Sequence, residues 1–187
     1  EGVWGFTPRF ADFDDDGWLD LALVVDFGGS RLFWNNGDGT FRDGTAASGV
    51  GTDKFGMGST IADFNGDGNL DWFVSSISAD SIRPDTHHLY FNAGNRLFSE
   101  ASATAGLNDK AWAWGTSAID YDNDGDHDIV LTTGVHNLPG ETDWVADPMR
   151  LLRNSGNGAF RDVAQPAGLT STDLGKGLLT FDYDLDG

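Results

Sequence analysis

Polar and apolar positions follow a pattern that recurs along this chain. A nine-residue stretch rich in aspartate is followed each time by a short apolar run, first Leu21–Val25, then Trp72–Val74, then Ile129–Leu131. These runs are short and rich in β-branched or aromatic residues, which predicts strands rather than helices. Each acidic stretch therefore connects two strands of a hairpin.

The strand that follows the first acidic stretch is apolar on both faces. Such a pattern is expected when a sheet packs between two neighbouring sheets. Alternate side chains point in opposite directions, which puts Leu19, Leu21, Leu23 and Val25 on one face and Ala22 and Val24 on the other.

A second pattern follows each acidic stretch. It is an apolar run that ends in asparagine, with glycine two residues later and phenylalanine six residues later. This predicts a hairpin turn between two further strands, so that each repeat has four strands. The asparagines are Asn35, Asn92 and Asn154, and the phenylalanines are Phe41, Phe98 and Phe160.

The length of the repeats varies in only one connection. Each asparagine lies 28 residues before the next acidic stretch, whereas the distance from the start of a stretch to its asparagine is 23, 29 and 34 residues. The variable connection joins the second and third strands and spans residues 26–31, 78–88 and 134–149. Because a constant scaffold with variable loops is how repeat folds carry function, we expect these loops to meet a protein or glycan partner.

The acidic stretches begin 51, 57 and 62 residues apart, and periods of this size are typical of propellers. The sequence therefore predicts an all-β fold of four-stranded antiparallel blades in a β-propeller-like repeat array, with three blades and part of a fourth. We expect one repeat domain over residues 1–187, with repeats at approximately 4–54, 55–111, 112–173 and 174–187.

The spacing within the acidic stretches is typical of calcium loops. Oxygen-bearing side chains occupy positions 1, 3, 5 and 9, glycine occupies position 6, and position 7 can add a backbone carbonyl. We expect one Ca²⁺ per complete loop, three in all, or four if the last loop is completed. The expected ligands are Asp12, Asp14, Asp16, the Trp18 carbonyl and Asp20; Asp63, Asn65, Asp67, the Asn69 carbonyl and Asp71; Asp120, Asp122, Asp124, the Asp126 carbonyl and Asp128; and, in the incomplete loop, Asp182, Asp184 and Asp186.

These loops are not EF-hands. An EF-hand has a bidentate glutamate at position 12 and a helix on each side, whereas position 12 here is Leu23, Val74 or Leu131 inside a predicted strand. The remaining alternative is a solvated acidic turn, and three complete copies with one spacing argue against it.

Composition narrows the possible partners and compartment. The formal net charge is −19, and sixteen of the thirty acidic residues lie in the four acidic stretches. No basic patch is present to neutralise phosphates, which argues against nucleic-acid binding. No apolar run approaches the length of a membrane span. Calcium sites of this type need the high free calcium outside cells, so we expect an extracellular or cell-surface location.

The combined motifs resemble the FG-GAP/VCBS repeats of integrin-α-type β-propellers. The resemblance rests on the acidic loops, on Phe55-Gly56 before the second loop, and on Asn-x-Gly-x-x-x-Phe followed by Ala-Gly-Leu at 105–107 and 167–169. The combination of Asn-x-Gly-x-x-x-Phe with Ala-Gly-Leu resembles the repeats of a subgroup that includes cartilage acidic protein and bacterial secreted proteins. The resemblance implies four-stranded blades around an axis, with Ca²⁺ in the loop between the first and second strands.

Other functions have weaker support in the sequence. The chain has no Gly-x-Ser-x-Gly elbow, no phosphate-binding glycine loop and no cysteine. A carbohydrate-binding or polysaccharide-degrading propeller is the alternative to a non-catalytic scaffold for adhesion or assembly. In the variable loops, Trp144 could stack on a sugar or fold back on the sheet. The variable loops also contain histidines and acidic residues that could bind a transition metal or act as acid–base groups. The favoured interpretation is that they are solvent-exposed loop residues; they are His87, His88, His136, Asp80, Asp85, Glu141 and Asp143.

The sequence also carries an expectation about the ends of the array. Three blades do not close a ring, so their terminal sheets would expose apolar faces. We expect either a segment of a longer propeller or blades that stack on other copies of the chain, as a ring or a filament.

Overall fold

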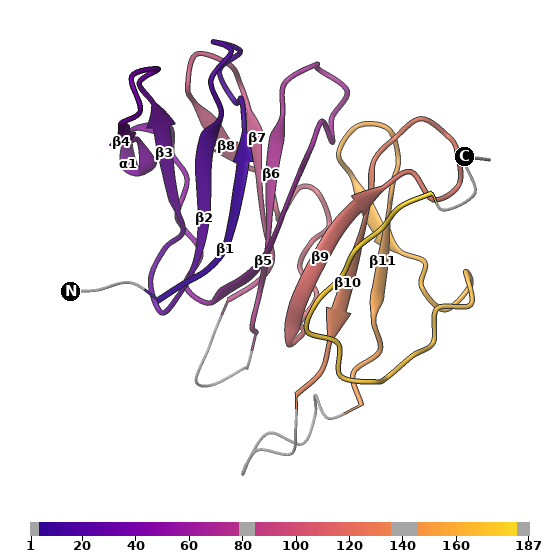
Figure 1. The fold of residues 1–187 in the computed structure, drawn as a ribbon. Helices are drawn as coiled ribbons and strands as arrows, with labels where there is room; N and C mark the ends of the chain where they lie inside the picture. Colours follow the sequence, from indigo (N-terminus) through magenta and orange to yellow (C-terminus); the bar gives the residue numbers. More distant parts are fainter. Residues whose placement is uncertain (1–3, 79–84, 136–145, 183–187) are drawn as a thin grey trace.

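The structure is a computed structural model that describes residues 4–78, 85–135 and 146–182, where nearly all regular elements are strands. The strands form three four-stranded antiparallel sheets whose strand order follows the chain (Figure 1). This confirms the predicted all-β fold of four-stranded sheets. The strands are β1 (Trp4–Ala11), β2 (Asp20–Asp26), β3 (Arg31–Asn35) and β4 (Phe41–Asp43); β5 (Gly56–Ala62), β6 (Asp71–Ser76), β7 (His88–Asn92) and β8 (Phe98–Glu100); β9 (Ala113–Ile119), β10 (Asp128–Thr133), β11 (Arg150–Asn154) and β12 (Phe160–Asp162).

A short helix, α1 (Thr45–Ser48), lies in the connection between the first two sheets, where the sequence pattern predicted only a connector. It ends at Gly49, whose φ of 80° is a left-handed conformation that glycine adopts without strain. A Cβ atom at Gly49 would lie 3.0 Å from the Phe98 carbonyl oxygen of the next sheet. The glycine therefore both ends the helix and lets the chain pass close to β8.

The sheets pack face to face through two apolar clusters. Between the first and second sheets, Val24 and Trp34 pack with Trp72 and Tyr90, and all four are buried. Between the second and third sheets the buried cluster includes Phe73, Leu89, Ile129 and Leu152. The second sheet thus buries both faces of its strands. In the first sheet, where the pattern predicted the same, Ala22 and Val24 are buried, but on the other face Leu19 is exposed and Leu21 and Leu23 are only partly buried.

An edge-to-face aromatic pair marks each interface. Phe13 meets Phe98 with ring centroids 5.6 Å apart, and Phe64 meets Phe160 at 5.8 Å. In both pairs the first ring follows position 1 of an acidic loop, and the second begins the fourth strand of the next sheet. The equivalent Phe41 meets no such ring among the described residues and is 43% exposed, whereas Phe98 is 8% exposed.

Residues 174–182 lie along β9, on the side away from β5 (yellow in Figure 1). The Thr180 hydroxyl contacts the Ser117 hydroxyl at 2.7 Å and donates to the Ala118 carbonyl, and Lys176 lies 3.1 Å from the centroid of the Trp114 ring. The segment occupies the place of a first strand of a fourth blade, but among the described residues it pairs with no second strand and is not itself a strand.

The three acidic loops all lie at the same end of the sheets, at the top of Figure 1. Residues 26–31 lie at the opposite end, where β2 turns into β3. The other two variable connections, 78–88 and 134–149, are described only in part, because residues 79–84 and 136–145 fall outside the described residues.

Candidate functional site

The backbone of each acidic loop is folded around the aspartate at position 1. Asp12 accepts hydrogen bonds from the backbone N–H groups of Asp16 and Gly17, at 3.1 and 2.8 Å. Asp63 and Asp120 accept the equivalent bonds in the second and third loops. The carboxylate thus draws the chain into a tight turn around itself.

Two positions of each loop adopt left-handed backbone conformations. The position-6 glycines, Gly17, Gly68 and Gly125, have φ values of 87°, 90° and 93°, as the calcium-loop pattern predicts. Position 4 is also left-handed, with φ of 60°, 75° and 57° at Asp15, Gly66 and Asn123. Asp, Gly and Asn are the residue types that tolerate this conformation best, a signal that the sequence interpretation did not use.

The aspartate at position 9 is fully buried in all three loops. The Asp71 carboxylate accepts backbone hydrogen bonds from Phe64 at 2.9 Å and from Asn92 at 2.8 Å. Asp20 and Asp128 make the same pair of bonds. Burial raises the pKa of all three carboxyl groups, that of Asp71 to about 6, against the lowering effect of these bonds. Each position-9 aspartate therefore fastens its loop to the third strand.

The asparagines at the ends of the third strands of the second and third sheets join neighbouring loops. The Asn92 side-chain amide donates to the Leu70 carbonyl of its own loop and to the Phe13 carbonyl of the preceding loop, at 3.2 and 2.7 Å. Asn154 donates equivalently to the carbonyls of His127 and Phe64. The sequence interpretation took the Asn-x-Gly pattern for a turn signal only, whereas the structure shows a clamp between blades.

Carboxylate oxygens converge inside the first and third loops. Ligand atoms of Asp12, Asp14 and Asp20 all lie within 4.8 Å of one another. The same holds for Asp120, Asp122 and Asp124 in the third loop. One oxygen of Asp14 is buried and has no hydrogen-bond partner, an arrangement that a bound cation would satisfy. A set of hard oxygen donors of this kind fits Ca²⁺.

The remaining predicted ligands have less distinctive surroundings. In the second loop the Asp67 backbone N–H donates to Asp63 and Asn65, and the Asp71 carboxylate accepts the Phe64 N–H. The carboxylate oxygens of this loop do not converge within 4.8 Å as those of the first and third loops do. Trp18, Asn69 and Asp126, whose carbonyls are the predicted position-7 ligands, follow the position-6 glycines, and their backbone N–H groups donate to the position-5 aspartates. In the incomplete fourth loop, Asp182 is described, while Asp184 and Asp186 lie outside the described residues.

Two arginines contact the acidic loops and were not among the predicted site residues. Arg96, in the turn between β7 and β8, forms ion pairs with Asp14 and Asp16 of the preceding sheet's loop. Arg153, on β11, pairs with Asp122 and Asp124 at 2.6 and 2.8 Å. They occupy different positions in their repeats, so no periodic signal in the sequence pointed to them.

The histidines of the second variable connection are structural, which corrects the expectation of solvent-exposed loop residues. His88 is 9% exposed and its Nε2 lies 2.9 Å from an Asp85 oxygen. The other Asp85 oxygen accepts backbone hydrogen bonds from Lys54 and Phe55. His87 is 1% exposed and packs against the Phe73 ring. Trp144 and the other polar residues predicted in the variable loops lie outside the described part of the chain. These polar residues are Asp80, His136, Glu141 and Asp143.

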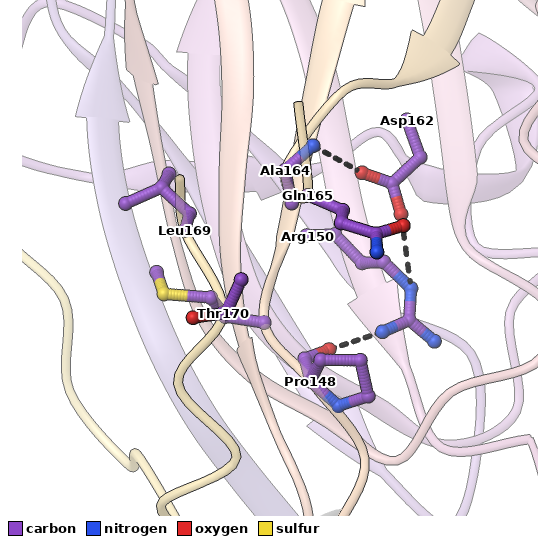
Figure 2. Close-up of a pocket in the computed structure, with 8 residues that line it drawn as sticks. Pro148, Arg150, Asp162, Ala164, Gln165, Leu169 and Thr170 are labelled. Atoms are coloured by element: carbon purple, nitrogen blue, oxygen red, sulfur yellow. Dashed lines mark hydrogen bonds and ion pairs between the residues drawn. The ribbon is translucent and has the colours of Figure 1, made fainter. Parts of the chain in front are cut away.

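A pocket of about 500 Å³ lies on the face of the third sheet, beside the ion pair of Arg150 and Asp162 (Figure 2). Its apolar wall includes Leu169. The equivalent residues of the other repeats, Val50 and Leu107, are buried by the following sheet. The pocket therefore occupies a place that blade packing fills elsewhere in the chain, and it carries no convergent set of catalytic groups.

Comparison with known families agrees with this geometry. The FG-GAP-like repeat family matches residues 4–74 and 77–131, about two thirds of the chain. The chain belongs to the FG-GAP-like repeat family. The two matched segments contain all three complete acidic loops, so each loop lies within an FG-GAP repeat. No curated protein matches the chain. FG-GAP repeats are typically extracellular domains, and no helix in the described part of this chain is long and apolar enough to cross a membrane.

Proposed function

We propose that this FG-GAP repeat chain is a calcium-binding extracellular module, a rigid scaffold for adhesion, protein interaction or assembly. The observation that carries the proposal is the convergence of Asp12, Asp14 and Asp20, with one buried Asp14 oxygen left without a partner. Oxygen donors at this spacing suit a hard divalent cation. The second and third loops repeat the same backbone geometry.

The proposed role of calcium is structural. Each loop joins the first two strands of a sheet and is fastened to its third strand and to the neighbouring loop. A cation that offsets the repulsion among the carboxylates therefore stabilises the contact between sheets as well as the loop. With a Kd near 0.1 mM, about 2 mM calcium stabilises the fold by roughly 1.8 kcal/mol per site.

The proposed location follows from that affinity range, since millimolar free calcium is found outside cells. The proposed contact surface for a protein or glycan partner is the set of variable connections at residues 26–31, 78–88 and 134–149, of which residues 26–31 lie at the end of the sheets opposite the acidic loops. The exposed Phe10, Leu19 and Phe41 of the first sheet support self-association as a second mode of contact.

Calcium binding is tested by thermal unfolding in 2 mM CaCl₂ and in EGTA, together with metal analysis after equilibrium dialysis. We expect about three bound Ca²⁺ per chain and a higher melting temperature in calcium. Magnesium at the same concentration is the control, because it demands octahedral geometry and gives up its water reluctantly. Identical melting curves in CaCl₂ and EGTA, with no bound calcium, would exclude the proposal.

A further inference from the structure

In all three acidic loops, both oxygens of the position-5 aspartate accept hydrogen bonds. In each loop, one oxygen of this carboxylate accepts the backbone N–H of position 7, at 2.9, 2.8 and 3.0 Å for Asp16, Asp67 and Asp124. The other oxygen accepts a side-chain donor in every loop. The identity of that donor differs between the loops and follows the residue at position 3.

In the second loop position 3 is Asn65, and it supplies the donor itself. Its side-chain amide donates to Asp67 at 3.1 Å, so positions 3 and 5 are joined directly. In the first and third loops position 3 is an aspartate, which at neutral pH can only accept hydrogen bonds. Two adjacent carboxylates cannot join in this way and repel each other instead.

An arginine supplies the missing donors in both of these loops. Arg96 donates through Nε to Asp14 and through Nη2 to Asp16, the latter at 3.2 Å. Arg153 donates through the same two nitrogens to Asp122 and Asp124. The planar guanidinium fork spans the two carboxylates, a geometry that lysine lacks.

The arginines also make the charge of the three sites equal. The first and third loops each have four ligating aspartates and one arginine, whereas the second has three aspartates, one asparagine and no ion pair with an arginine among the described residues. The net charge of each ligand set with its arginine is therefore −3. The asparagine and the Asp–Arg pair are two solutions to the same electrostatic requirement.

The position of the arginine leaves the inner face of the site open. Arg96 holds one oxygen of Asp14, and the other oxygen is the buried one without a partner. The Asp14 side chain is only 7% exposed, and its ligand atom lies within 4.8 Å of those of Asp12 and Asp20. The guanidinium thus binds the outer side of the ligand set, where it does not occupy the place of a cation.

We propose that Arg96 and Arg153 are positioning residues of the cation sites, each required because its loop has aspartate rather than asparagine at position 3. The proposal rests on the calcium binding proposed above. Arg96 belongs to the second sheet and its guanidinium lies 5.1 Å from the Trp34 ring of the first, so the first site is completed only when the two sheets are packed together. Arg153 serves the loop of its own sheet.

The test is a calcium titration of ¹⁵N-labelled protein followed by the amide signals of Gly17, Gly68 and Gly125. Each of these amides donates to the position-1 aspartate of its own loop, so each reports one site. In Arg96→Gln we expect the midpoint for Gly17 to rise about tenfold, as for other residues that orient metal ligands, while Gly68 keeps its midpoint. In Arg153→Gln we expect the calcium midpoint for Gly125 to rise instead, while Gly68 again keeps its midpoint.

A double variant makes the test specific for positioning. Asp14→Asn with Arg96→Gln gives the ligand side chains of the first loop the composition of those in the second, and we expect the Gly17 midpoint to return toward that of Gly68. A general loss of stability would not be reversed by a second substitution in the loop. Arg42→Gln and Arg161→Gln are the matched controls, since these exposed arginines form no ion pair with another described residue.

The outcomes separate the two proposals. If none of the three glycine amides responds to calcium in the unmodified protein, the proposed function fails. If all respond but Arg96→Gln and Arg153→Gln leave the midpoints unchanged, the arginines are not part of the sites. A lower midpoint in these variants would show that the guanidinium competes with the cation, which also overturns the inference.

Discussion

At the scale of single residues, Asn92 shows how much one side chain contributes to this fold. Its backbone N–H donates to Asp71, its side-chain amide donates to Phe13 and Leu70, and its side-chain oxygen accepts the Gly94 N–H. These four bonds link a turn, a strand and two acidic loops. Asn35 makes the same bonds within its own repeat, and among the described residues its side chain reaches no second loop.

Replacing asparagine by aspartate tests this clamp, because the substitution keeps the shape and the turn-capping oxygen but removes both amide donors. Asn92→Asp should destabilise the protein by about 3 kcal/mol, since it leaves the buried Phe13 carbonyl and the partly buried Leu70 carbonyl facing a carboxylate. Asn35→Asp is the matched control and should cost about 1 kcal/mol, because only one carbonyl loses its donor. Urea unfolding measures both. Equal costs would mean that the bond between loops contributes nothing.

The Asp85–His88 pair predicts a pH dependence at the other end of the sheets. Burial alone would lower the pKa of His88, but the hydrogen bond and charge of Asp85 outweigh it, and the net shift is upward. Burial would raise the pKa of Asp85, and the bond from His88 reverses that shift. A raised histidine pKa stabilises the fold below its unfolded value near 6.5, and this contribution is lost as pH rises through the folded pKa.

We therefore expect His88→Gln to cost about 2 kcal/mol at pH 5.5 and clearly less at pH 9. Unfolding free energies at the two pH values, each compared with the unmodified protein, measure the difference. His127→Gln, at an exposed side chain, is the control for replacing a histidine elsewhere in the fold. A cost for His88→Gln that is the same at both pH values would rule out the charged pair.

At the scale of elements, the phenylalanines that begin the fourth strands occupy equivalent positions in the three sheets but differ in burial. Phe98 and Phe160 begin the fourth strands of the second and third sheets and are buried against a ring of the preceding loop. Phe41 begins the fourth strand of the first sheet and is partly exposed. The difference arises from packing between sheets, because the local sequence around these residues is similar.

Phe98→Ala should destabilise the protein by about 3 kcal/mol, through lost burial and the cavity that remains between sheets. Phe41→Ala, at the equivalent but exposed position, should change stability by less than about 1 kcal/mol. Both are measured by denaturant unfolding at low protein concentration, where self-association does not contribute. A large cost for Phe41→Ala in a monomer would contradict this account of the interfaces.

At the scale of the whole molecule, the periodic part of the sequence predicted the fold well. The recurrence of acidic loops, asparagines and phenylalanines at fixed offsets predicted three four-stranded sheets, because each offset corresponds to one strand and its turn. The helix α1 was missed, since Thr45–Ser48 is a small-residue stretch without apolar periodicity. Residues 174–182 carry the pattern of a first strand, but they pair with no second strand among the described residues and do not form a strand.

The candidate site was predictable only in its local part. The loop residues of positions 1 to 9 are contiguous, so their spacing alone brought them together. Arg96 reaches the first loop from 80 residues away in the chain, and only the packing of the second sheet on the first places it there. The burial of His87 and His88 likewise depends on contacts between sheets, which a single sequence does not reveal.

The clamp made by Asn92 and Asn154 has a consequence for how such a chain can evolve. Each repeat carries the asparagine that reaches backward and also the loop carbonyl that the next asparagine will reach. A tandem duplication of one repeat unit within the gene therefore supplies both halves of a new interface at once, already in register. For this clamp, the number of blades can change by unequal recombination without a compensating substitution. The Arg96–Asp14 contact differs because it joins only the first and second sheets, so after a duplication it would still identify these two blades as original neighbours.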